Sequence, residues 1–182
     1  MTIAAIIVII IRLLVPLTIL RWRITGAIAS MLIDAIDVML VDVLATAFNE
    51  PGGFGDRYQL FDKWLDMYYL AFELYVSLSW SNVLARNTSI FLFVFRLVGL
   101  IAFEATHIRN LFFFFPNLFE NFFLYFIIAE RAAPRYLPTK PWHIPLALVL
   151  LYIPKLGQEY VLHVAQLHPW GWTKEVIFGI ES

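Results

Sequence analysis

The sequence predicts an all-α, polytopic membrane protein with six transmembrane helices. Its 182 residues are 61% hydrophobic and 15% charged, and its mean hydropathy is +0.76. A water-soluble domain of this size cannot cover so much apolar surface with so little charge, which excludes soluble, disordered and fibrous proteins. The apolar residues also form six runs, each roughly long enough to cross a hydrocarbon core of about 30 Å. We expect helices because the alternating strand pattern of a barrel is absent.

The six runs follow one another with short polar breaks. They cover residues 2–20, 26–48, 58–78, 83–105, 111–129 and 144–163. The first lacks a basic leader and a small-residue cleavage site, which favours an uncleaved helix over a signal peptide. The Pro- and Gly-rich segment 49–55 predicts a loop, and three prolines between 134 and 141 predict a short connector. We therefore expect one six-helix transmembrane domain over 1–165, followed by a Trp-containing tail, 166–182, along the membrane surface.

Net charge and cysteine content exclude further classes of protein. The net charge of −1 provides no basic surface for nucleic acid. The absence of cysteine excludes disulfides, thiolate zinc sites and thiol nucleophiles. The loops after the first, third and fifth spans contain more Lys and Arg than the segments on the other side of the membrane. The positive-inside rule therefore places these loops in the cytoplasm and both termini outside it.

Ionisable residues inside the spans are the main clue to function. Each centrally placed Asp, Lys or Arg costs about 2.5 to 3.5 kcal/mol on membrane-insertion scales. Such residues therefore predict a polar interior or a water-filled cavity. They include Asp34, Asp37, Asp42, Asp62, Lys63, Asp66, Glu73, Arg96, Glu104, Glu120, Lys155, Glu159 and His163.

Four aspartates on two consecutive spans predict a metal site. Asp34 and Asp37 lie three residues apart, and Asp62 and Asp66 four residues apart, so each pair shares a helix face. Nearby cations look too few to neutralise them, because Lys63 lies about 100° around the helix from Asp62. Oxygen-only ligands favour Mg²⁺, Mn²⁺ or Ca²⁺. Two alternatives are ion pairs or capping, with Asp34 paired to Arg12 or Arg96, and a proton or ion pathway.

These aspartates resemble a known motif. CDP-alcohol phosphatidyltransferases are six-helix membrane enzymes with D-x-x-D-G-x-x-A-R and G-x-x-x-D-x-x-x-D on the second and third helices. Asp34 and Asp37 match the first half, and Asp62 and Asp66 match the second. The resemblance implies Mg²⁺ or Mn²⁺ on Asp34, Asp37 and Asp62, with Asp66 as the base for the alcohol. It also implies phosphoryl-group transfer from a CDP-linked lipid, with release of CMP, in phospholipid biosynthesis.

The motif is incomplete in this chain. Val38, Val41, Asp42 and Tyr58 stand where the family has Gly, Ala, Arg and Gly, and 25 residues separate Asp37 from Asp62. The Arg-to-Asp difference removes a phosphate partner and adds repulsion toward a diphosphate. The alternative expectation is therefore a relative of this family that has lost or changed its catalytic activity.

Two further functions fit the same sequence. A non-catalytic subunit of a larger membrane complex, or a homodimer, would use the intramembrane charges to specify helix packing and partner contacts. A transporter or proton-conducting protein would use the ionisable stripes of the third and sixth spans, with a polar path from Asp66 toward Glu159. In every case we expect lipids as partners.

Overall fold

A computed structural model of the chain describes residues 2–54, 58–108 and 111–159, apart from the side chains at 58–61, 112–113, 154–155 and 158–159. Within these ranges the regular structure is helical, which confirms the all-α class. The helices are α1 (Ile3–Leu14), α2 (Arg23–Phe48), α3 (Tyr58–Ser77), α4 (Val83–Thr106), α5 (Leu111–Phe114), α6 (Leu118–Ala132) and α7 (His143–Glu159), with 3₁₀ segments η1 (Val15–Leu20) and η2 (Pro134–Tyr136). The predicted tail, 166–182, lies outside the described residues.

Local chemistry explains where these helices begin and end. Thr2 and Asn82 accept hydrogen bonds from the amides of Ala5 and Ala85, which caps α1 and α4. Asn49 and His107 end α2 and α4 in the left-handed conformation, with φ of 54° and 56°. Pro16 has no amide hydrogen, and the first helix tightens there from α1 into η1.

The fifth predicted span is wrong as one continuous helix. α5 ends at Phe114 and α6 begins only at Leu118. Pro116 lies between them, where it removes a helical hydrogen bond and clashes with the preceding turn. The segment formed by α1 and η1, and the helices α2, α3 and α4, lie within a few residues of the first four predicted spans, and α7 begins beside the sixth.

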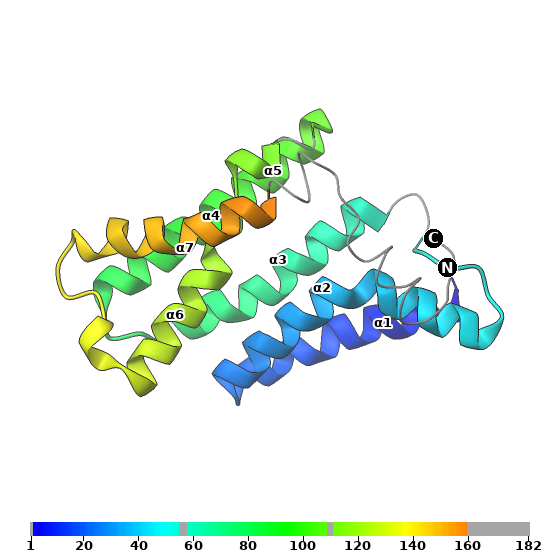
Figure 1. The fold of residues 1–182 in the computed structure, drawn as a ribbon, viewed down its shortest axis with the longest axis horizontal. Coiled ribbons are helices and arrows are strands. Elements are labelled where there is room, and N and C mark those ends of the chain that lie inside the picture. Colours follow the sequence, from blue (N-terminus) through cyan, green and yellow to red (C-terminus); the bar gives the residue numbers. More distant parts are fainter. Residues whose placement is uncertain (1, 55–57, 109–110, 160–182) are drawn as a thin grey trace.

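α3 is the central helix of the bundle. It contacts α1, η1, α2, α4 and α6, and Figure 1 shows it between the α1–α2 pair and the α4, α6 and α7 group. The α6 side of this core is aromatic, and Trp80 stacks on Phe126 with ring centroids 3.9 Å apart. This arrangement brings the charged residues of α3 against several neighbouring helices.

Two helices in the described part of the chain are long and apolar enough to cross a membrane, Ile3–Leu20 and Val83–Thr106. Both also expose large aliphatic or aromatic side chains, such as Ile10 on α1 and Phe91 on α4. The full six-span arrangement stays a prediction.

Candidate aspartate centre

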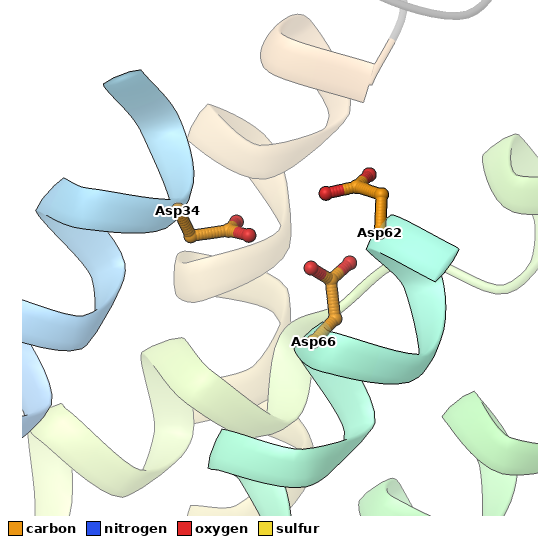
Figure 2. Close-up of side chains that lie close together, drawn as sticks. All are labelled: Asp34, Asp62 and Asp66. Carbon is orange, nitrogen blue, oxygen red and sulfur yellow. The ribbon is translucent and has the colours of Figure 1, made fainter. Parts of the chain in front are cut away.

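The four motif aspartates meet at one point between α2 and α3. Figure 2 shows Asp34 of α2 directed toward Asp62 and Asp66 of α3. One carboxylate oxygen from each of these three residues lies within 4.8 Å of the other two. Asp37 joins the same centre through a shared partner, Arg12. The helical spacings thus direct each pair inward, as the sequence predicts.

Arg12 of α1 contacts all four carboxylates. Its Nη1 bonds Asp37 and Asp62, the latter at 2.6 Å, and its Nη2 bonds Asp34 and Asp66, the latter at 2.9 Å. The guanidinium is inserted because Arg12 continues the buried face of α1 that includes Ala4 and Val8, at four-residue spacing. Its side chain is only 3% exposed. Arg12 is therefore the residue that joins α1, α2 and α3.

Two more cations border the centre. Lys63 Nζ lies 2.8 Å from Asp62 and 3.4 Å from Asp66. Arg96 of α4 lies 3.9 Å from Asp66 and donates a hydrogen bond of 2.9 Å to the Phe115 carbonyl. The aspartates therefore have more cationic neighbours than the sequence indicates. Lys63 overcomes its position around the helix because its long, flexible side chain bends toward Asp62.

The carboxylates differ in access to solvent. The side chains of Asp37 and Asp66 are 5% and 8% exposed, whereas those of Asp62 and Asp34 are 17% and 29% exposed. Asp37 also accepts a hydrogen bond from the Val38 amide. A ligand would therefore approach from the side of Asp34 and Asp62, with Asp37 and Asp66 deeper in the bundle.

The donor atoms suit a hard divalent cation. Mg²⁺ and Mn²⁺ prefer carboxylate oxygens, and the three converging oxygens of Asp34, Asp62 and Asp66 are placed to share one ion. Among the residues that the structure describes, four carboxylates face three cationic side chains, which leaves one carboxylate charge in excess. The same oxygens already bond Arg12, so a bound cation would share them with the guanidinium.

Other predicted polar residues lie elsewhere. Asp42 accepts a hydrogen bond of 2.9 Å from the Gly53 amide and so fastens the 49–55 loop to α2. Glu73 and Glu120 belong to a second buried group between α3 and α6. The side chains of Lys155 and Glu159, and all of His163, lie outside the described residues.

Two residues of these centres were not among the predicted site residues. Arg12 is the one charge in the aliphatic run 2–20, and that isolation is the signal that could have identified it. Tyr69 donates a hydrogen bond of 2.5 Å to Glu120. It lies three residues after Asp66, on the same helix face, but aromatic residues are so frequent in this sequence that it did not stand out.

A separate groove of about 330 Å³ lies between α6, η2 and α7, and its lining combines leucines with aromatic residues such as Tyr125, Tyr136 and Trp142. It shares no lining residue with the aspartate centre.

Comparison with known proteins gives no relative. No protein-family model, no curated protein and no solved structure matches this chain.

Proposed function

We propose that the chain is a multi-pass membrane phosphotransferase of the CDP-alcohol phosphatidyltransferase type. It would use Mg²⁺ or Mn²⁺ to transfer a phosphoryl group from a CDP-linked lipid to an alcohol. The observation that carries this proposal is the meeting of four carboxylates, at motif-like spacing on two consecutive helices, in a largely apolar bundle. Residues of one charge are held so close inside a hydrophobic protein only when a cation or proton compensates them.

The exposed surface supports a membrane location. Ile3, Ile6 and Ile10 of α1 are all exposed, as are Phe91 and Val98 of α4. Contiguous apolar surface of this kind is costly in water and ordinary against lipid. The CDP-linked lipid would then reach the site from within the bilayer.

The residues would divide the chemistry as the family resemblance implies. Asp34, Asp37 and Asp62 would hold the cation, which supplies neutralisation of the charge that develops on the diphosphate. Asp66, whose carboxylate converges with those of Asp34 and Asp62, would take the proton of the acceptor hydroxyl. Arg12 and Lys63 would supply the positive charge for the diphosphate that the family obtains from Arg at the position of Asp42.

Release of CMP tests this proposal. The purified protein would be incubated with a CDP-linked lipid, Mn²⁺ or Mg²⁺, and candidate alcohols. We expect metal-dependent CMP release that Asp66→Asn lowers by a factor of about 10² to 10⁴, the usual contribution of a general base. The matched control is Glu104→Gln, which removes a carboxylate outside the centre but keeps an acceptor for Trp64. Equal CMP release by Asp66→Asn and wild type would overturn the assignment.

A non-catalytic membrane subunit is the second candidate. Arg12 bonds every one of the four aspartates, as expected for charges that specify how helices pack. This candidate predicts no CMP release with any alcohol and no effect of Mg²⁺ or Mn²⁺ on thermal unfolding. The phosphotransferase predicts both effects, so the two measurements separate the candidates.

A further inference from the structure

Glu73 of α3 is an acidic residue buried in the core of the bundle. Its exposure is 0%, and neither of its carboxyl oxygens has a hydrogen-bond partner among the described residues. It lies seven residues after Asp66 on α3, two turns farther along the helix. A buried ionised carboxylate without a partner is strongly destabilising, so this position requires a compensating ligand.

The surroundings of Glu73 contain a second acid. Glu120 of α6 lies near enough for the two charges to repel each other. Glu120 accepts hydrogen bonds from the Tyr69 hydroxyl at 2.5 Å and from the Asn117 amide at 2.7 Å, so its negative charge is stabilised by two donors. The Asn117 Oδ1 atom is itself buried without a hydrogen-bond donor among the described residues. The Glu73 oxygens and Asn117 Oδ1, which have no donor among the described residues, are all hydrogen-bond acceptors. A positively charged or hydrogen-donating ligand would satisfy them.

The buried cation of the neighbouring helix α4 has other partners. Arg96 of α4 bonds the Phe115 carbonyl and faces Asp66. It makes no hydrogen bond to Glu73, whose two oxygens lack any such partner in the described part of the chain. A proton is the smallest ligand that neutralises Glu73, and it fits without any rearrangement of the packed helices.

We propose that Glu73 is a proton-binding site, protonated at neutral pH, while the neighbouring Glu120 stays ionised. The proton comes from water and forms an O–H bond on one Glu73 oxygen, so the pair carries a single negative charge. Repulsion between Glu73 and Glu120 disfavours ionisation of both. The two donors on Glu120 decide which member of the pair stays charged.

Tyr69 lies between the Glu73–Glu120 pair and the aspartate side of the bundle. Tyr69, which bonds Glu120, also lines a small cavity of about 10 Å³ together with Arg12 and Ser30. A cavity of this size holds about one water molecule. We therefore assign the Tyr69 hydroxyl and this cavity as the path by which the Glu73 proton exchanges with the aspartate side of the bundle. The assignment does not depend on the proposed phosphotransferase activity.

Infrared spectroscopy of the full chain in lipid nanodiscs tests the site. Wild type at neutral pH is expected to show the C=O stretching band of a protonated carboxylic acid, shifted on transfer to D₂O. Glu73→Gln is expected to remove this band. Glu120→Gln is the matched control and is expected to keep it, because Glu73 stays buried and neutral. Tyr69→Phe is expected to retain the band but slow its shift in D₂O.

Several results would overturn the proposal. Absence of the band in wild type, or its survival in Glu73→Gln, would show that Glu73 does not hold the proton. Loss of the band in Glu120→Gln but not in Glu73→Gln would assign the proton to Glu120 instead. A large fall in the unfolding temperature of Glu73→Gln would also contradict it, because glutamine reproduces the neutral acid in shape and charge. An unchanged exchange rate in Tyr69→Phe would overturn the route.

Discussion

Arg12 decides how the aspartate centre is held together. A guanidinium presents several N–H donors in a planar fork, and here its two Nη atoms serve carboxylates from both α2 and α3. A lysine at this position would offer a single ammonium point charge and could not contact four carboxylates in the same way. The convergence of the aspartates therefore depends on a residue from a third helix.

Replacing Arg12 should unfold or loosen the protein. Arg12→Gln leaves four carboxylates without their shared cation, and removing one partner of a buried ion pair costs about 3 to 5 kcal/mol. We expect a markedly lower unfolding temperature in detergent, with partial recovery on addition of Mg²⁺ or Mn²⁺, because a bound cation replaces the lost charge. Arg21→Gln, at an exposed position outside the helices, is the control and should unfold like wild type. An Arg12→Gln protein as stable as wild type would contradict the role given to Arg12.

The sequence predicted part of this centre. Helical spacing alone places Asp34 with Asp37 and Asp62 with Asp66, and the structure confirms both pairs. An ion pair of Asp34 with Arg12 was one alternative from the sequence, but the sequence could not predict that Arg12 bonds all four carboxylates, because these contacts span up to 54 residues and depend on how α1 packs. Likewise, the reach of Lys63 depends on its rotamer rather than on its position around the helix.

At the scale of elements, small residues set the distance between the first two helices. Ala4, Ala5 and Val8 of α1 pack against Val41 and Ala45 of α2. Close approach of helix backbones through small residues is a common way to pack helices within a membrane. The same packing of α1 against α2 places Arg12 beside Asp34 and Asp37. A change in this helix contact would therefore also displace Arg12 from the aspartate centre.

Gly26 makes a particularly close contact at the other end of this pair. A Cβ atom at Gly26 would lie 2.5 Å from the backbone nitrogen of Ile19. Backbone atoms cannot move aside cheaply, so Gly26→Ala should destabilise the protein by about 1 to 3 kcal/mol, as other overpacked sites do.

Chemical or thermal unfolding of the two glycine variants would check this prediction. Gly157→Ala is the matched control, because a Cβ atom there meets nothing within 4 Å and alanine favours a helix. Equal stability of Gly26→Ala and Gly157→Ala would mean that η1 and α2 are not so closely packed.

Element boundaries were more predictable than element continuity. Polar and Gly-rich breaks placed the ends of α2, α3 and α4 within a few residues. The break between α5 and α6 was missed, because the phenylalanines around Pro116 make a continuous apolar run. A hydropathy pattern measures only apolar content, whereas the break is caused by the missing amide hydrogen of proline.

At the scale of the whole molecule, composition predicted a membrane protein and the structure gives it apolar outer surfaces. The outward faces of α1, α4 and α7 carry exposed residues such as Leu14, Val94 and Leu150. The number of membrane crossings follows from how these surfaces lie in a bilayer, and the packing of the helices alone does not determine it.

The lack of cysteine allows a direct test of topology. A single cysteine at each of three exposed positions, Ser81→Cys, Thr139→Cys and Ile108→Cys, would be labelled with a maleimide that cannot cross membranes. The positive-inside rule predicts that positions 81 and 139 label from the cytoplasmic side and position 108 from the opposite side. Labelling of all three positions from one side would contradict six crossings.

Binding of Mn²⁺ to the purified full chain tests the central claim most directly. In an electron paramagnetic resonance titration, free Mn²⁺ gives a sharp signal that is lost on binding. The account predicts that wild type and the Glu104→Gln control bind Mn²⁺ at one site, that the Asp34→Asn/Asp62→Asn double variant does not, and that Mg²⁺ competes. Equal Mn²⁺ binding by wild type and the double variant, or none by either, would show that the four aspartates do not form a metal centre.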